Sequence, residues 1–320
     1  MPFETIRGLD STLGLLRRSL RSGRIAHAYL FEGVEGCGKK KTALAFIEAL
    51  FCGRDEGCGT CPSCRKMATL QHPDLHLVEP EGSFIKIDQI RDLQKQLSFR
   101  PFEAPKKACI IDDAERLNPA AGNALLKTLE EPPGNALLIL ITAGSGSMLP
   151  TILSRCQQLH FPALPHDAIE QHLIDEGVVP ETARVAASLA AGSMRKAVEI
   201  SREESVQRRA TLLERLAALS LGNVAALFAA AEEQAADKEA AVEMLELLTL
   251  FYRDALLLVS GGRDLANVDL IPLVERAAKS HSPTRLMEKL QQVEDARQAL
   301  SRNINTRLAL DVLFMRLAKT

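Results

Sequence analysis

The first half of the chain alternates short apolar runs with amphipathic segments. The runs at residues 28–32, 108–112 and 136–142 are almost wholly apolar, as in strands of a parallel sheet that helices cover on both faces. Between them, residues 42–51 and 85–99 place apolar side chains at steps of three and four, which predicts helices. A further helix is expected from Asn118 as N-cap and Pro119 at its first position, ending at Pro132-Pro133. We therefore predict an α/β domain over residues 1–164.

From Leu164 onward the apolar runs disappear and only helical spacing remains. The helical segments are interrupted at Gly177, Gly192, Gly222 and Gly261-Gly262. The Ala-rich segment 225–241 is interpreted as helix, because alanine is the strongest helix former. We predict a small helical unit at 165–203 and a larger helical bundle at 204–320, with the boundary near the polar segment 201–209.

Composition narrows the functional classes. The chain has 320 residues, 25% of them charged, and a net charge of −2, which argues against binding nucleic acid through a broadly basic surface. The N-terminus has no apolar signal segment, and no stretch approaches 18 uninterrupted apolar residues. We therefore expect a cytoplasmic protein that does not insert into a membrane.

The segment GVEGCGKK at residues 33–40 matches the phosphate-loop pattern G-x-x-x-x-G-K-[ST] except at its last position. The candidate ligands of ATP or ADP are Gly33, Gly36, Gly38 and Lys39. Lys40 replaces the hydroxyl that ligates Mg²⁺ and can only donate hydrogen bonds, so we expect an impaired magnesium site. Thr42 points about 200° away along the helix and cannot substitute for it. A Gly-rich turn that binds no nucleotide is the alternative.

A pair of acidic residues follows the apolar run at 108–112. In phosphate-loop ATPases this position carries a carboxylate that orients magnesium, here Asp112, and a Glu that polarises the attacking water. The second residue here is Asp113, whose side chain is one methylene shorter than that of Glu. Together with Lys40 it argues against efficient ATP hydrolysis. A solvated acidic turn is the alternative.

Four of the seven cysteines lie within thirteen positions. They are Cys52, Cys58, Cys61 and Cys64. Four thiolates so close together can form a closed tetrahedral shell around Zn²⁺, which predicts a structural zinc site. Unmetallated thiols or redox chemistry are the alternatives. His72 and His76 lie nearby as reserve candidates for metal ligands, but we interpret them as ordinary loop residues.

Several longer segments resemble one known family. AHAYLFEGVEGCGK at 26–39, IIDDAERLNPAAGNALLKTLEEPP at 110–133, ILSRC at 152–156 and RNINTRLALDVLF at 302–314 are similar to the bacterial DNA polymerase III clamp-loader subunits gamma/tau and delta-prime. The resemblance implies an AAA+ P-loop module with a zinc module inserted at about 52–64, then an all-α lid and an all-α collar. The family's first cysteine gap is longer, which leaves open whether Cys52 completes the metal site.

The same resemblance implies a biological role. The altered phosphate loop and the short chain favour the delta-prime branch, which has little or no ATPase activity of its own. The implied partners are the gamma/tau and delta subunits and, through the complex, the sliding clamp and primed DNA.

Roles for three further residues come from the resemblance. Arg155 matches the arginine of the family's Ser-Arg-Cys motif, which enters the ATP site of the neighbouring gamma subunit as an arginine finger. Thr142 matches a polar sensor position and Arg195 the lid's second sensor. The alternatives are a surface arginine, a hydrogen-bonding residue at a strand end and a helix cap, respectively.

Three functions therefore compete. The first is a weakly catalytic or non-catalytic clamp-loader subunit that donates Arg155 in trans. The second is a self-sufficient AAA+ ATPase, which requires magnesium-dependent turnover by the isolated chain that depends on Lys39. The third is a zinc-dependent redox or nucleic-acid-binding module.

Overall fold

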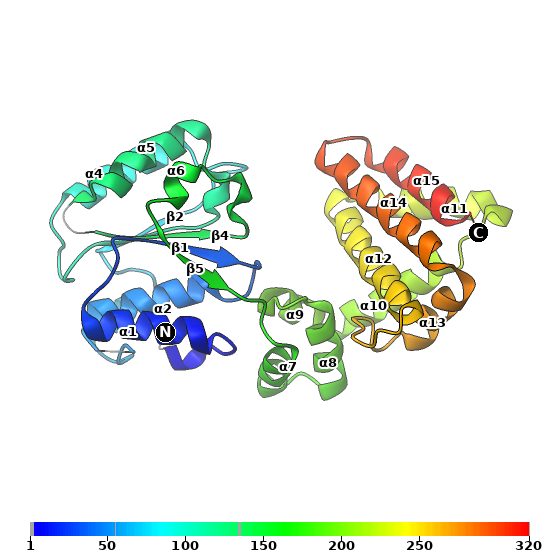
Figure 1. Cartoon of the computed structure of the whole chain (residues 1–320), viewed down its shortest axis with the longest axis horizontal. Helices are drawn as coiled ribbons and strands as arrows, with labels where there is room; N and C mark the ends of the chain where they lie inside the picture. Colours follow the sequence, from blue (N-terminus) through cyan, green and yellow to red (C-terminus); the bar gives the residue numbers. More distant parts are fainter. Residues whose placement is uncertain (1–2, 55, 134–135, 320) are drawn as a thin grey trace. The chain divides into compact units, whose positions relative to one another are not determined.

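The computed structural model describes residues 3–54, 56–133 and 136–319 (Figure 1). The chain forms two compact units. The first contains Met1–Ala168 together with Gly192–Arg195, and the second contains Ile169–Ala191 and Lys196–Thr320.

A five-stranded parallel sheet is the centre of the first unit, with strand order β2-β3-β4-β1-β5. The strands are β1 (Ala28–Gly33), β2 (Leu75–Val78), β3 (Ala108–Ile111), β4 (Leu137–Thr142) and β5 (Gln157–Phe161). Three of them, β1, β3 and β4, are the predicted apolar runs, and they form the buried middle of the sheet. The two edge strands, β2 and β5, were not predicted, because they carry polar residues such as His76 and His160.

Helices cover both faces of this sheet, as Figure 1 shows, with α1 and α2 on one face and α4, α5 and α6 on the other. The helices of the unit are α1 (Asp10–Ser22), α2 (Lys39–Cys52), α3 (Pro62–Ala68), α4 (Ile87–Ser98), α5 (Pro119–Glu130) and α6 (Pro150–Leu153). The predicted start of α5 is confirmed, because the Asn118 side chain accepts a hydrogen bond from the Ala121 N–H at 2.7 Å. Side chains of α4, α5 and α6 share one core with β1, β3 and β4.

The described chain after β5 contains helices and turns only. These helices are α7 (His166–Asp175), α8 (Pro180–Leu189), α9 (Met194–Ile200), α10 (Glu203–Ala217), α11 (Val224–Gln234), α12 (Lys238–Val259), α13 (Ile271–Ser280), α14 (Pro283–Ser301) and α15 (Thr306–Leu317). The predicted fold class is confirmed: a parallel α/β domain followed by helices alone. The Ala-rich segment is helical apart from the interruption at Ala235–Asp237.

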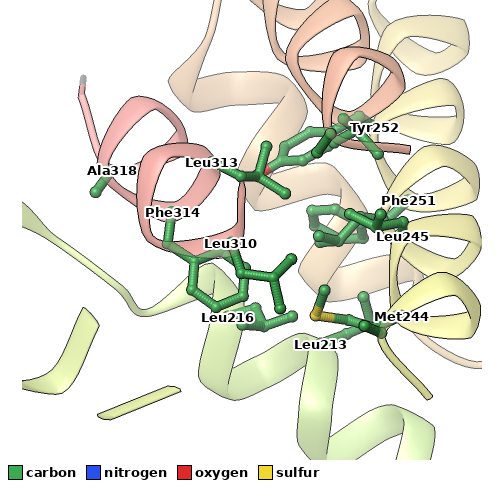
Figure 2. Close-up of a cluster of buried hydrophobic side chains, with 14 of the residues drawn as sticks. Leu213, Leu216, Met244, Leu245, Phe251, Tyr252, Leu310, Leu313, Phe314 and Ala318 are labelled. Atoms are coloured by element: carbon green, nitrogen blue, oxygen red, sulfur yellow. The ribbon is translucent and has the colours of Figure 1, made fainter. Parts of the chain in front are cut away.

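The C-terminal helices are held together by one apolar core. Figure 2 shows side chains of α10, α12 and α15 pointing toward one another. Its largest fully buried side chain is Phe314 of α15, and Phe251 and Tyr252 of α12 pack edge to face at 5.3 Å between ring centroids. The predicted divisions at residues 164 and 203 stay predictions.

In the described part of the chain, no single helix is both long and apolar enough to cross a bilayer. One strongly bent pair, Ser205–Ala217 with Leu221–Gln234, meets the length and composition requirement only when both helices are taken together.

Candidate functional site

The phosphate loop has the predicted strand, loop and helix context. It leaves β1 at Gly33 and enters α2 at Lys39, with Gly38 at the helix N-cap in a left-handed conformation (φ 102°). Gly36 also has a positive φ of 78°, and a Cβ added there would lie 2.3 Å from the Ser193 hydroxyl oxygen. Position 36 therefore accepts only glycine, because both the backbone conformation and the neighbouring atoms exclude a side chain there.

The lysine of the loop is turned inward. Lys39 is 6% exposed, and its Nζ donates to the carbonyl oxygens of Gly33 at 2.6 Å and Val34 at 2.9 Å. These two carbonyls belong to the loop itself. The ammonium is therefore held inside the loop, next to the N-terminus of α2, and a helix N-terminus favours anions.

The neighbouring lysine, Lys40, contacts carboxylates at the carboxyl ends of two strands. Lys40 Nζ lies 3.0 Å from Asp112 Oδ2 and also donates to Glu79 Oε1. Asp112 directly follows β3, and Glu79 directly follows β2. Burial acts to lower the pKa of Lys40, but the hydrogen bonds and charges of the two carboxylates outweigh it and hold the pKa above its usual value.

The second acidic residue of the pair adopts an unusual backbone conformation. Asp113 has a φ of 48°, and its N–H donates to Asp112 Oδ1 at 3.2 Å. Its carboxylate lies 3.7 Å from Arg116 Nε. Burial, followed by the negative charge of Asp112, raises the pKa of Asp113 above its usual range.

The structure brings Arg195 to the phosphate loop. Arg195 lies in the first turn of α9, and its Nη2 is 2.6 Å from Glu35 Oε1 within the loop. The backbone reinforces this contact, because the Met194 N–H donates to the Gly36 carbonyl oxygen at 3.1 Å. Residues predicted from two distant motifs therefore lie side by side.

Thr142 ends β4 beside the loop-bearing strand. It pairs in register with Glu32 of β1 and is fully buried. Its hydroxyl donates to the Gly144 carbonyl oxygen at 3.0 Å and accepts from the Gly144 N–H at 3.1 Å. The hydroxyl thus closes a turn within its own segment.

Arg155 lies at the end of α6. Its Nη2 is 2.6 Å from Glu130 Oε1, and its Nη1 donates to the Thr151 carbonyl oxygen at 3.0 Å and to the Ser154 hydroxyl at 3.3 Å. All three partners are on or beside α5 and α6. The guanidinium is half-buried, and among the described residues its polar partners come from these segments and not from the phosphate loop.

The four clustered cysteines converge on one point. The Sγ atoms of Cys52, Cys58, Cys61 and Cys64 all lie within 4.8 Å of one another. The distance is 3.9 Å between the Sγ atoms of Cys58 and Cys64 and 3.8 Å between those of Cys61 and Cys52. A tetrahedron with Zn–S bonds of about 2.3 Å has edges of roughly 3.8 Å, so the cluster fits a metal ion such as zinc.

Helix ends position these thiols. Cys52 is the last residue of α2, and Cys61 caps α3, where its Sγ accepts from the Cys64 N–H at 3.5 Å. The Cys61 N–H donates to Cys58 Sγ at 3.3 Å. The pKa of the Cys58 thiol is lowered to about 5. The largest cause is the hydrogen bond from the Thr60 hydroxyl, followed by those from the backbone N–H groups of Thr60 and Cys61.

The two nearby histidines lie outside the cysteine cluster. His72 is buried, packs against the Phe51 ring at 4.5 Å between centroids, and accepts from the Asp74 N–H at 3.2 Å through Nδ1. His76 is part of β2. The prediction of a loop position is confirmed for His72 and wrong for His76, which is a strand residue.

Sequence reasoning missed the acidic partners of the site cations, which are Glu35, Glu79 and Glu130. The position of Glu79 directly after a strand could have indicated a site residue, but that strand, β2, was not predicted from the sequence. Glu130 gave no signal, because its contact with Arg155 depends on the packing of α5 beside α6.

Comparison with known proteins decides the family. The model of the family described as "DNA polymerase III, delta subunit" matches residues 8–165, and the model described as "DNA polymerase III, delta subunit, C terminal" matches residues 203–319. DNA polymerase III subunit delta' of Bacillus subtilis is 36% identical over 310 residues, which cover 95% of this chain and 94% of that protein. The chain belongs to the DNA polymerase III delta-prime family.

Two further comparisons agree with this family and with the fold. DNA polymerase III subunit tau of Escherichia coli is 30% identical over 346 residues, which cover 98% of this chain but only 53% of tau. The crystal structure of a gamma subunit-related protein from Thermotoga maritima has a TM-score of 0.52 and 20% identity, and covers 97% of this chain and 100% of that one. The second comparison supports the fold alone, and this chain spans about half the length of tau.

Proposed function

We propose that this chain is a clamp-loader subunit that does not hydrolyse ATP itself and that donates Arg155 to the nucleotide site of a neighbouring gamma/tau subunit. The observation that carries the proposal is the position of Lys40. Its ammonium is paired with Asp112, the carboxylate expected to orient magnesium, at 3.0 Å. Without a hydroxyl ligand at this position, the loop lacks a group that hydrolysis in phosphate-loop enzymes requires.

The geometry of Arg155 supports action in trans. Its polar partners are on α5 and α6, and the side chain is 35% exposed. A planar, permanently charged guanidinium suits the charge that develops on a transferring phosphoryl group. Arg155 therefore combines access to a neighbour with partners that orient it.

The loop keeps groups for binding a nucleotide without hydrolysing it. Lys39 and the backbone of Gly33, Gly36 and Gly38 would contact the phosphates. Arg195, Thr142 and Asp112 would surround them as the sensor and acidic positions of the site.

The four cysteines would hold a structural Zn²⁺. A complete set of four thiolates leaves no open position for a substrate or water, so a catalytic role is not expected. The ion would connect the end of α2 to the start of α3.

We assign the helical lid to residues 165–203 and the helical collar to residues 204–320. We propose the gamma/tau and delta subunits as direct partners. The chain would reach the sliding clamp and primed DNA through the complex. A cytoplasmic location follows from this role.

Reconstitution tests the proposal. The full chain is combined with gamma/tau and delta subunits, and loading of the sliding clamp onto primed DNA is measured with and without it. We expect loading to depend on the chain and the isolated chain to show no magnesium-dependent ATP turnover. Turnover by the isolated chain that Lys39→Ala abolishes would instead support the alternative, a self-sufficient gamma-like ATPase.

A further inference from the structure

The position of the Lys40 ammonium has a consequence for the form of nucleotide that this chain can bind. Lys40 is in the first turn of α2, at the place where phosphate loops carry the magnesium-ligating hydroxyl. Its Nζ lies 3.0 Å from Asp112 Oδ2 and also contacts Glu79 Oε1. Two carboxylates that follow adjacent strands, β3 and β2, thus share one positive charge.

The same carboxylates do not fit a magnesium ion while this contact exists. Mg²⁺ requires near-octahedral oxygen ligands at about 2.0–2.1 Å, and a lysine supplies none. An ammonium on Asp112 would also repel a divalent ion that bound the same carboxylate.

The three consecutive lysines, Lys39, Lys40 and Lys41, have different partners. Lys39 is directed into the loop, toward the carbonyls of Gly33 and Val34. Lys41 is directed away from it, and its Nζ donates to the Thr5 carbonyl oxygen at 2.8 Å. Of the three, Lys40 alone contacts the carboxylates at the ends of β2 and β3 in the described structure.

We infer that the ammonium of Lys40 replaces Mg²⁺ in this site, so that the loop binds a nucleoside diphosphate or triphosphate as the metal-free anion. Lys39 and the loop N–H groups would face the nucleotide's negative charge, while Lys40 offsets the charge of the two carboxylates that would otherwise repel the anion. This inference rests on the proposed phosphate-binding role of residues 33–40, but it does not depend on the role of Arg155.

Calorimetry with ADP tests this inference on the full chain, in excess Mg²⁺ and in EDTA. For the wild-type chain we expect ADP to bind at least as tightly in EDTA as in Mg²⁺. Lys40→Thr restores the complete loop pattern and frees Asp112, so we expect Mg²⁺ to tighten ADP binding by tenfold or more in this variant. Lys41→Thr removes the same charge one residue away and should behave as wild type.

Three results would overturn the inference. They are a tenfold gain in wild-type affinity on adding Mg²⁺, no ADP binding by the wild-type chain in either buffer, and equal magnesium dependence in wild type and Lys40→Thr. Clamp loading by the reconstituted complex is measured separately. A chain that supports loading but fails this test contradicts only the inference, whereas a chain that passes it but does not support loading contradicts only the proposed function.

Discussion

The guanidinium of Arg155 and the carboxylate of Glu130 form an ion pair in which Nη2 lies 2.6 Å from Oε1. Glu130 is the last residue of α5, and Arg155 follows α6 closely, so the pair joins two helix ends. With the Thr151 carbonyl and the Ser154 hydroxyl, it fixes the direction of the guanidinium. We expect this direction to matter when Arg155 acts on a neighbouring subunit.

Glu130→Ala should lower ATP turnover of the reconstituted clamp loader by about 1.4- to fivefold, because an exposed ion pair of this kind contributes roughly 0.2–1 kcal/mol to side-chain placement. Glu130→Gln keeps a hydrogen-bond acceptor, so its ATP turnover should lie between those of wild type and Glu130→Ala. Glu131→Ala, at the next and exposed position, is the matched control. Turnover equal to wild type in Glu130→Ala would show that the pair does not position Arg155.

The purified chain should contain one zinc ion, measured by elemental analysis. Cys61→Ser removes a sulfur that lies 3.8 Å from Cys52 Sγ and caps α3, so we expect loss of the metal and a lower melting temperature. Cys156→Ser lies outside the cluster and should keep its zinc. Full zinc content in Cys61→Ser would contradict the four-sulfur site.

A buried polar network in the C-terminal helices should be important for stability. Asp254 of α12 is fully buried, and its Oδ2 accepts from both the backbone N–H and the side-chain amide of Asn267 at 2.7 Å. Asn267 in turn accepts from Arg209 at 2.6 Å. Asp254→Ala should lower the free energy of unfolding by roughly 2–4 kcal/mol, because it leaves buried donors unpaired.

Urea unfolding measures this loss. Asp264→Ala, at an exposed position of the same connection between α12 and α13, is the control and should change stability by less than about 0.5 kcal/mol. Equal effects of the two substitutions would mean that the network contributes little.

Stability should also depend on pH through Lys289. This residue is buried on α14, its Nζ donates to the Leu317 carbonyl oxygen, and burial lowers its pKa to about 8. An unfolded lysine keeps its proton up to about pH 10.4, so between these values the unfolded chain binds more protons than the folded one. The free energy of unfolding should therefore rise with pH over this window, by roughly 1–3 kcal/mol.

The check is urea unfolding at pH 8 and pH 10 for the wild type and Lys289→Met. The rise assigned to Lys289 is the difference between the two proteins, since other groups titrate equally in both. A wild-type rise no larger than that of Lys289→Met would contradict the assignment.

The sequence predicts those parts of the fold whose pattern is local. The strands β1, β3 and β4 are buried on both faces and therefore appear as apolar runs. The start of α5 is fixed by Asn118 and Pro119, two adjacent residues with known preferences. The edge strands lack such a pattern, because residues such as Gln157 and His160 of β5 are exposed.

The site, too, has parts that a local sequence pattern predicts and parts that it does not. Motif spacing alone indicated the loop at residues 33–40 and the four cysteines, whereas the role of Arg155 came from the resemblance to clamp-loader subunits. The contact between Lys40 and Glu79 joins residues 39 positions apart, and that between Arg195 and Glu35 joins residues 160 apart. Such partners follow from how the elements pack, which the residue pattern of a single sequence does not encode.

The most direct test of the central claim, that this chain's contribution to ATP hydrolysis is made in a neighbour's site, is steady-state ATP turnover by the reconstituted clamp loader. Two variants of this chain are compared with wild type: Arg155→Ala and Lys39→Ala. We predict a severalfold or greater loss with Arg155→Ala, because an arginine finger contributes strongly to phosphoryl transfer, and near wild-type turnover with Lys39→Ala. Unchanged turnover with Arg155→Ala, or an equal loss with Lys39→Ala, would contradict the account.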